Sequence, residues 1–213
     1  YGMGTTKALG EALIGLKQLC EDKKIQQACG AYGDALLEDA RNKPAGDASI
    51  AAEQEQAKKL YSDLCAATGE GCLSFAQAFE PDPKARFTLF QKGCDKGQFD
   101  ACSELAAAYE DGKGVEKNAK TAQQIFEKAC QRGHAASCGR LAVFYLEGST
   151  PEDQQKGAQL SKDACDDGDP RGCGNYGTCL ATGTGVEKNP AGAAPYLKRA
   201  CAQGIQNACD TLQ

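Results

Sequence analysis

Residues 105–138 read LAAAYEDGKGVEKNAKTAQQIFEKACQRGHAASC and contain one complete helical-hairpin pattern. Small and apolar residues recur at helical spacing on both sides of a turn: Leu105, Ala106 and Tyr109 before it, and Ala122, Phe126 and Ala129 after it. The turn is DGKGVEKN (111–118), whose glycines break the first helix and whose Asn118 can N-cap the second. The segment therefore predicts two helices joined by a tight turn and followed by a corner between Cys130 and Cys138.

The cysteines indicate that this pattern repeats along the chain. Of the 13 cysteines, twelve form six near pairs: Cys20 with Cys29, Cys65 with Cys72, Cys94 with Cys102, Cys130 with Cys138, Cys165 with Cys173, and Cys201 with Cys209. The leading cysteines of the last four pairs recur every 35 or 36 residues, a period typical of arrays built from one supersecondary unit. A glycine follows each of these four cysteines by three residues, and glycine can end a helix in the left-handed conformation.

The repeated pattern predicts an all-α chain in which shorter A helices alternate with longer B helices. The A helices are expected near 29–40, 72–80, 100–111, 136–147 and 171–182. The B helices are expected near 5–20, 50–65, 83–94, 118–130, 152–165 and 190–201. Each A helix is expected to start at the second cysteine of a pair, and each B helix to end at the first cysteine of the next pair. Residues 41–49 are expected to form a longer turn, and no strand pattern competes with the helices.

The overall composition excludes several classes of function. The 213 residues carry 24 Lys and Arg against 29 Asp and Glu, a net charge of −5, which argues against nucleic acid or an anionic membrane as the main partner. No apolar run approaches the roughly 18 residues that a membrane span needs. Residues 1–5 show no signal peptide, so we expect a processed or trimmed chain. Thirteen cysteines in a chain of this length indicate an oxidising compartment or a metal site.

On these residues, the chain resembles the Sel1-like repeat family, whose fold is a tetratricopeptide-like α/α solenoid. Within that family it is similar to the disulfide-bridged, cysteine-rich proteins known from Helicobacter. The resemblance spans about 20–209, is most specific at 105–138, and departs from the pattern at 29–72 and 146–152. It implies a right-handed α/α solenoid of about five hairpins that forms a single domain. Within 1–213 we assign an N-terminal helix at 5–28, repeats near 29–65, 72–94, 100–130, 136–165 and 171–201, and a partial helix at 207–213.

Each near pair of cysteines brackets a corner between a B helix and the next A helix. Two antiparallel helices meet at such a corner, so the two sulfur atoms can approach to disulfide distance. The alternative is a metal site, but zinc and iron–sulfur sites usually contain a Cys-x2-Cys motif. The closest two cysteines here, Cys173 and Cys179, are six residues apart. We therefore expect a disulfide within each near pair and no metal.

Cys179 has no partner in this scheme and lies inside the predicted helix 171–182. We interpret it as a buried free thiol that packs as a small apolar residue. The alternative interpretation is an intermolecular disulfide or a reactive nucleophile. Rapid labelling of the native protein at Cys179 would favour that alternative.

The sequence contains no recognisable catalytic or cofactor-binding motif. Serine-hydrolase, zinc-protease and phosphate-loop motifs are absent, and we expect no catalytic residue, no cofactor and no metal. The single histidine, His134, is expected to be an exposed loop residue, and the acidic stretch CDDGDP (165–170) lacks a calcium-loop pattern. The resemblance leaves one alternative, because cysteine-rich members are described as binding or slowly hydrolysing penicillin-like compounds. That alternative is a β-lactam- or peptidoglycan-binding hydrolase.

The expected partner is another protein, bound on the concave face that the A helices of such solenoids line. With Leu105 and Tyr109 as core residues, the register predicts nine positions on this face: Leu73, Gln77, Glu80, Ser103, Ala107, Glu110, Val143, Leu146 and Thr178. An extended segment or a protruding helix fits such a face. The competing interpretation is that Leu73, Val143 and Leu146 only pack against adjacent repeats.

The resemblance implies a non-enzymatic binding protein of the bacterial periplasm or exterior. Sel1-like proteins include envelope adaptors, host-interaction factors and immunity proteins that block a secreted effector such as a phospholipase. The acidic balance of the chain would suit the occlusion of a basic effector cleft. A mitochondrial intermembrane-space assembly factor is a third hypothesis, since cysteine-rich Sel1-like chains also occur there.

Overall fold

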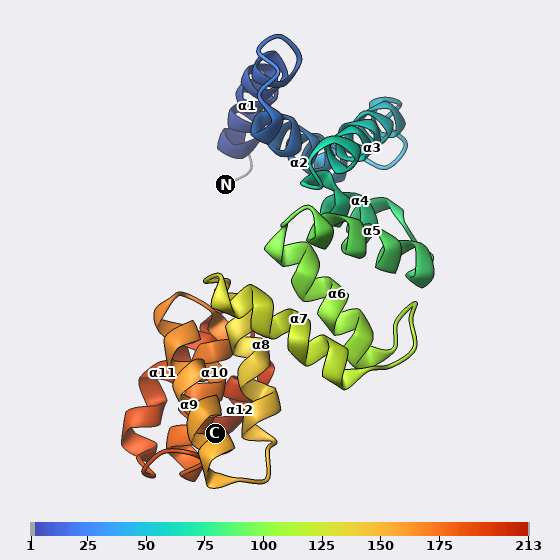
Figure 1. The fold of residues 1–213 in the computed structure, drawn as a ribbon. Helices are drawn as coiled ribbons and strands as arrows, with labels where there is room; N and C mark the ends of the chain where they lie inside the picture. Colours follow the sequence, from blue (N-terminus) through green and yellow to red (C-terminus); the bar gives the residue numbers. More distant parts are fainter. Residues whose placement is uncertain (1–2, 213) are drawn as a thin grey trace. The chain divides into compact units, whose positions relative to one another are not determined.

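The structure is a computed structural model that describes the backbone of residues 3–212 and the side chains of residues 8–212. The described residues form twelve helices and no strand (Figure 1). The helices are α1 (Met3–Glu21), α2 (Gln26–Asn42), α3 (Ser49–Ala67), α4 (Gly71–Phe79), α5 (Pro83–Asp95), α6 (Phe99–Asp111), α7 (Ala119–Gln131), α8 (Ala135–Leu146), α9 (Pro151–Asp166), α10 (Pro170–Thr182), α11 (Pro190–Ala202) and α12 (Gln206–Thr211). The even-numbered helices are the predicted A helices, and the odd-numbered helices are the predicted B helices. The predicted all-α repeat of helical hairpins is confirmed.

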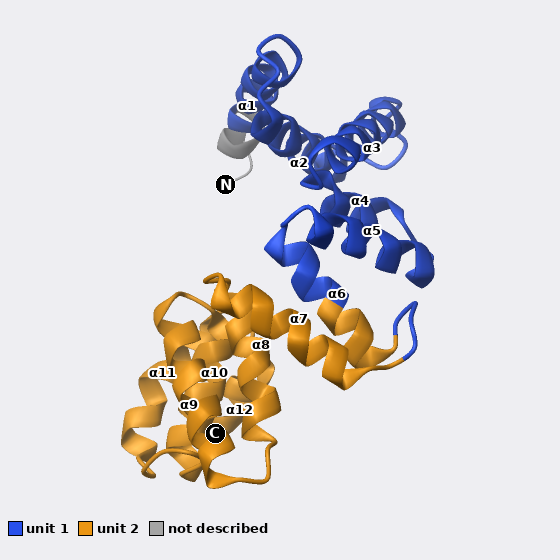
Figure 2. Ribbon diagram, in the orientation of Figure 1, with its two compact units in different colours: residues 1–105, 113–116 blue, residues 106–112, 117–213 orange. Residues whose placement is uncertain are grey.

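The chain divides into two compact units (Figure 2). Unit 1 contains residues 1–105 and 113–116, and unit 2 contains residues 106–112 and 117–213. The division passes through α6, whose first turns belong to unit 1 and whose last turn belongs to unit 2. The expectation of a single domain stays a prediction.

In unit 1, each helix from α1 to α4 packs against the next one along the chain. The central apolar cluster joins the first three helices and consists of Cys20, Tyr32, Leu36, Ala57 and Tyr61. The hydroxyl of the buried Tyr61 donates a hydrogen bond to Asp34 at 2.5 Å, and Gln56 donates one to the hydroxyl of Tyr32 at 3.1 Å. Two side-chain hydrogen bonds therefore join α2 to α3 in addition to the apolar contact.

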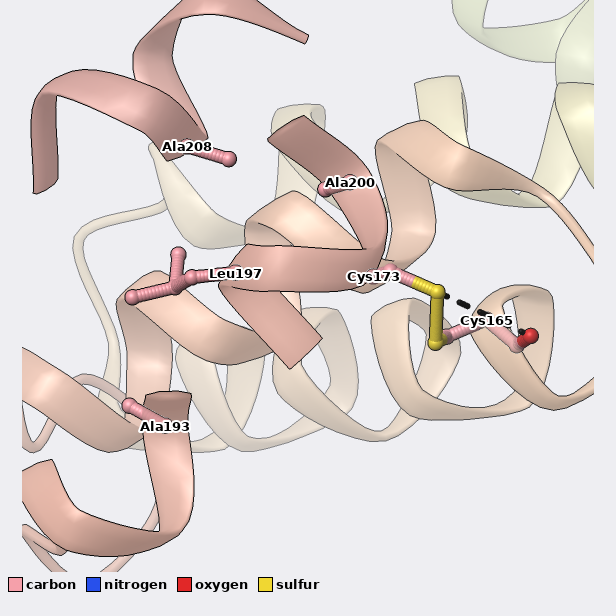
Figure 3. Close-up of a cluster of buried hydrophobic side chains, with 6 residues drawn as sticks. All are labelled: Cys165, Cys173, Ala193, Leu197, Ala200 and Ala208. Atoms are coloured by element: carbon pink, nitrogen blue, oxygen red, sulfur yellow. Dashed lines mark hydrogen bonds between the residues drawn. A yellow bond between two sulfur atoms is a disulfide. The ribbon is translucent and has the colours of Figure 1, made fainter. Parts of the chain in front are cut away.

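In unit 2, α10 is the central helix, because it contacts α8, α9, α11 and α12. The A helices α8, α10 and α12 thus form a layer of neighbouring helices, with α9 and α11 packed against α10 as B helices. Figure 3 shows one buried cluster of this unit, which consists of Cys165, Cys173, Ala193, Leu197, Ala200 and Ala208. Small residues dominate this cluster, so the helices can approach one another closely.

The structure contains a disulfide within each of the six predicted pairs. The bonds join Cys20 to Cys29, Cys65 to Cys72, Cys94 to Cys102, Cys130 to Cys138, Cys165 to Cys173, and Cys201 to Cys209. The Cα–Cα distances across them are 4.4–4.8 Å, and each joins the end of a B helix to the start of the next A helix. The metal alternative for these twelve cysteines is therefore wrong, because their sulfur atoms are bonded to one another. Each hairpin is covalently joined to the next at its corner.

The corner glycines adopt the predicted left-handed conformation. Gly97, Gly133, Gly168 and Gly204 have φ angles of +84° to +99°, which only glycine adopts without steric cost. At the first corner Lys24 takes this role, with a φ of +57°. The chain therefore reverses direction within a few residues at each of these corners.

The helix boundaries at the corners correct the prediction that each A helix starts at the second cysteine of a pair. Cys29, Cys102 and Cys209 are each the fourth residue of their helix, because α2, α6 and α12 begin three residues earlier. The same offset holds for α8 and α10, whereas α4 begins one residue before its cysteine. The B helices end one or two residues after the first cysteine of a pair. The physical reason is that the tight corner needs few residues outside the helices.

The predicted N-cap at Asn118 is confirmed, and Asn189 caps α11 in the same way in the similar turn TGTGVEKN (182–189). The Asn118 side chain accepts a hydrogen bond from the backbone N–H of Thr121 at 3.0 Å, and Asn189 accepts one from Gly192 at 2.9 Å. Where the chain lacks this motif, at 147–150, Thr150 caps α9 and accepts from the N–H of Asp153. Each B helix of unit 2 therefore has a side-chain cap at its start.

Candidate protein-binding groove

A groove of about 610 Å³ crosses the layer of A helices in unit 2, a volume within the usual range of ligand sites. It is lined by the last turn of α6, by one face each of α8 and α10, by α12, and by the short segment that precedes α12. Glu110, Arg140, Val143, Leu146, Arg171 and Thr178 are among the lining residues. The groove therefore lies on the face of the repeats that the sequence assigns to partner binding.

One side of the groove is formed by an ion pair between two A helices. An oxygen of the Glu110 carboxylate in α6 lies 3.5 Å from a guanidinium nitrogen of Arg140 in α8. The Arg140 guanidinium also lies 5.9 Å from the centre of the Phe126 ring, within cation–π distance. Arg140 is therefore held in place by a charge on one side and an aromatic ring on the other.

The hydroxyl groups of α10 in the groove are engaged within the protein. Thr178 donates to the carbonyl of Gly174, and Thr182 donates to the carbonyl of Thr178, both at 2.9 Å. Asn175 donates from its side-chain amide to the carbonyl of Gly139 in α8 at 3.1 Å. This last bond ties two A helices together at the groove.

The apolar part of the groove is formed by Val143, Leu146 and Ile205. Ile205 packs over α10 at Gly174, where an added Cβ would lie 3.3 Å from a methyl carbon of Ile205. Leu146 also packs against α9, because a Cβ on Gly157 would lie 2.8 Å from its branched carbon. These side chains are partly buried and partly available to a ligand.

Three consecutive segments of this region match one protein-family model, which is described as the Sel1 repeat. The matched segments are residues 99–134, 135–169 and 170–205, just over half of the chain. Each segment covers one A helix and the B helix that follows it. The chain belongs to the Sel1 repeat family. A search of curated proteins found no significant match.

Two solved Sel1-type structures have a similar fold. The chain aligns to c5321, a protective antigen of uropathogenic Escherichia coli with an SLR fold, at a TM-score of 0.66 and 19% identity, covering 94% of this chain and 47% of that one. It aligns to a Sel1 repeat protein from Oxalobacter formigenes at a TM-score of 0.65 and 18% identity, covering 92% and 86%. The chain thus spans about half the length of the first protein. The likeness shows that the fold is a Sel1-repeat solenoid.

A third match is cysteine-rich protein B of Helicobacter pylori. It is 24% identical, and the alignment covers 78% of this chain and 98% of that chain with a TM-score of 0.28.

Four of the nine predicted binding-face positions line the groove. They are Glu110, Val143, Leu146 and Thr178. The other five, which are Leu73, Gln77, Glu80, Ser103 and Ala107, are not among its lining residues, and their role in binding stays a prediction. Leu146 packs against Gly157 within its own Sel1 repeat and also faces the groove, so the competing interpretation, which places it against an adjacent repeat, stays a prediction.

Sequence reasoning missed the two arginines and the contribution of α12. Arg140 and Val143 are three residues apart, as are Arg171 and Gly174, so one more helical turn on the same face would have included both arginines. The segment 207–213 was expected only as a partial helix. In the structure α12 contacts α10, and Asn207 on α12 lines the groove.

Cys179 lies beneath the groove as a buried free thiol, as the first interpretation predicts. Only 2% of the residue is exposed, and burial raises the pKa of its thiol to about 11. The thiolate is the reactive form of cysteine, so this thiol is poorly reactive at neutral pH.

His134 is half-buried rather than exposed, because it occupies the N-cap position of α8. Its Nδ1 lies 2.8 Å from the hydroxyl oxygen of Ser137, a pairing that the sequence reasoning missed. Ser137 is fully buried at the start of α8, so its hydroxyl is not accessible to a substrate. The pair is a local contact between residues three apart in the chain.

Among residues 3–212, no cluster of three or more His, Cys, Asp or Glu side chains is arranged to hold a metal ion. In the acidic stretch 165–170, Asp169 caps α10 by accepting a hydrogen bond from the N–H of Gly172 at 2.8 Å. No helix within residues 3–212 is sufficiently long and apolar to cross a membrane.

Proposed function

We propose that this Sel1 repeat chain binds another protein through the groove of unit 2, without transforming it chemically. Sel1 repeats are scaffolds for protein–protein interaction, and the three matched repeats contribute most of the groove lining. The observation that carries the proposal is the groove itself, because four of its lining residues were predicted as partner contacts from the register of the repeats.

The disulfides support this function by fixing the groove before a partner arrives. The Cys165–Cys173 and Cys201–Cys209 disulfides lie at the corners that precede α10 and α12, the two helices that contribute most lining residues to the groove. A preorganised site loses less conformational entropy on binding than a flexible one. The structure of unit 2 thus suits a binding surface of fixed shape.

The six disulfides also indicate an oxidising environment outside the cytoplasm. As a finer proposal, we assign the chain to the bacterial periplasm or exterior. There it would act as an adaptor, or as an inhibitor that protects a cell against a secreted effector such as a phospholipase. The net charge of −5 favours a basic partner surface outside the groove.

Site-specific photocrosslinking tests the proposal. A photoreactive amino acid replaces Thr178, which is exposed in the groove, or Lys198, which is exposed on the B helix α11. In a periplasmic extract, we expect the Thr178 position to yield a defined adduct that the Lys198 position does not. Adducts of equal pattern and yield at both positions would contradict binding in the groove. In a chromogenic β-lactam assay on the same protein we expect no turnover, whereas turnover would favour the hydrolase alternative.

A further inference from the structure

We infer that the groove of unit 2 takes a linear protein segment in which an acidic side chain stands next to an aliphatic one, with Arg171 pairing the acid. This inference rests on the proposed function and names the chemistry of the partner. It follows from the charges, the hydrogen-bonding groups and the apolar residues that line the groove.

The first observation is the charge of the groove. Its lining contains two arginines and one glutamate, a formal charge of +1, in a chain whose net charge is −5. Arg140 is already paired with Glu110 at 3.5 Å. Arg171 is exposed and forms no ion pair or hydrogen bond with the residues that the structure describes. One positive charge in the groove is therefore left for a ligand.

The second observation concerns the hydrogen-bond donors. The hydroxyls of Thr178 and Thr182 donate to carbonyls of their own helix. Arg171 is a donor without an acceptor function, and its planar guanidinium matches a carboxylate in a bidentate geometry. The Asn207 side-chain amide on α12 likewise makes no hydrogen bond within the described part of the chain. The unengaged donors of Arg171 and of the Asn207 NH2 group thus favour a ligand that supplies acceptors.

The third observation is the position of Arg171 in its helix. It is the second residue of α10, directly after Pro170 and the N-cap Asp169. A helix N-terminus carries partial positive charge, so an acidic residue is favourable there and an arginine is not. Helix formation therefore does not explain an arginine at this position, whereas pairing with an acidic ligand does.

The apolar side of the same groove supplies the second half of the ligand. Val143, Leu146 and Ile205 line the groove together with Arg171 and leave apolar surface for an aliphatic side chain. Lining residues continue on both sides of Arg171, from α8 to α12. A bound segment would therefore extend past Arg171 in both directions. The carboxylate that pairs with Arg171 is then that of a side chain and not that of a chain terminus.

A peptide-display selection tests this inference on the full disulfide-bonded chain. Random peptides are displayed in two formats, one with the peptide internal and one with a free C-terminus, and are selected on the parent protein. The selection is repeated on three variants. Arg171→Glu reverses the charge in the groove, Arg132→Glu makes the same change at an exposed site outside it, and Thr178→Tyr blocks the groove with a bulky neutral side chain.

We expect internal peptides with Asp or Glu beside Leu, Ile or Val to be enriched on the parent protein and lost on Thr178→Tyr. For acetylated, amidated copies of these peptides, Arg171→Glu should raise the Kd by about tenfold or more. Arg132→Glu should change the same Kd by less than about twofold. The thermal midpoint of Arg171→Glu should be no lower than that of the parent, so the loss is not unfolding.

The other outcomes separate the two proposals. Enriched peptides that require an open groove but lack acidic residues would overturn this inference and leave the proposed function standing. Enrichment only in the free C-terminal format would overturn the assignment to an acidic side chain. If Thr178→Tyr selects the same peptides as the parent protein, binding in the groove is wrong and both proposals fall.

Discussion

The α2–α3 hairpin of unit 1 and the α10–α11 hairpin of unit 2 have the same helix order, but different chemistry closes their turns. In unit 2, Gly183 and Gly185 adopt left-handed backbone angles and Asn189 caps α11. In unit 1, Lys43 pairs with Asp39 at 2.7 Å and with Glu53, and so links the end of α2 to α3 across the longer turn. One hairpin is closed by backbone conformation and the other by side-chain charge.

This difference explains which part of the chain has a recognisable sequence pattern. Glycines and asparagines at fixed positions leave a motif that recurs from repeat to repeat, and the three family matches lie in 99–205. An ion pair such as that of Lys43 can be formed by many residue combinations, so it leaves no motif. Similar hairpins can thus be conspicuous or inconspicuous in sequence, depending on how their turns are closed.

The largest effect is expected from removing a buried disulfide in either unit. Cys165→Ala with Cys173→Ala in unit 2, and Cys65→Ala with Cys72→Ala in unit 1, should each lower the free energy of unfolding of their own unit by about 2–5 kcal/mol. All four cysteines are at most 3% exposed, so the two pairs are well matched. Residue-resolved hydrogen exchange in urea measures each unit separately. Unchanged protection in both units would contradict a stabilising role for the disulfides.

A smaller effect is expected at the glycine that precedes the second cysteine of a pair. A Cβ on Gly71 would lie 2.2 Å from the carbonyl oxygen of Tyr61, and one on Gly172 would lie 2.7 Å from the Cβ of Ala164. Gly71→Ala and Gly172→Ala should each lower the free energy of unfolding by about 1–3 kcal/mol, because the helices must move apart. Urea denaturation measures this loss.

Gly15→Ala is the control for this pair, since a Cβ there would have no neighbour within 4 Å. In the middle of α1, this substitution should increase stability by about 0.5–1 kcal/mol, because alanine favours the helix more than glycine does. A loss at Gly15 equal to that at Gly71 would show that helix packing is not the cause.

The ion pairs of Lys43 should contribute less than either glycine contact. Hydrogen bonds to Asp39 and Glu53 raise the pKa of Lys43 above its ordinary 10.5, so the charged amine is favoured in the folded state. The stability that it contributes is full below pH 10.5 and is lost as the pH rises through the raised folded pKa. Lys43→Met should therefore lower the thermal midpoint at pH 7, and the difference should shrink above pH 10.5 and in 1 M salt.

Lys162→Met in unit 2 is the matched control, because Lys162 pairs with Asp166 on the exposed side of a single helix, α9, rather than across a turn. Its effect on the thermal midpoint should be close to zero, as for most exposed pairs. Equal effects of the two substitutions would remove the distinction between the two hairpins.

The smallest effect is a gain in stability at the groove. Arg171→Glu should raise the free energy of unfolding by about 0.3–1 kcal/mol, because a carboxylate suits the first turn of α10. Chemical denaturation at low salt measures the gain, with Arg132→Glu as the charge-matched control. A loss of stability at Arg171 would show that the arginine supports the fold rather than a ligand.

The sequence predicts the fold well because the repeat has two independent markers. The spacing of the cysteine pairs marks each corner, and apolar residues such as Phe126 and Leu197 mark the face that each B helix buries. The helix boundaries are predicted less accurately, because Gly133 and Gly168 let the chain reverse within three residues. The sequence pattern places such a corner but does not show how short it is.

The groove was only partly predictable because its residues come from four A helices of the repeat array. The repeat register predicts Val143 and Thr178, since each keeps a fixed distance from the cysteines of its own repeat. It does not predict that Arg140 is engaged by Glu110 while Arg171 is left without a partner, because that depends on how neighbouring helices pack. The role of α12 depends in the same way on its contact with α10.

Counting alkylated cysteines in the unfolded protein tests the disulfide-joined repeat most directly. The protein is unfolded in guanidinium with an alkylating reagent, with and without prior reduction, and the adducts are counted by intact mass. Six disulfides and one free thiol predict one adduct without reduction, at Cys179, and 13 adducts after it. Three or more adducts before reduction, or an adduct on any cysteine other than Cys179, would contradict the account.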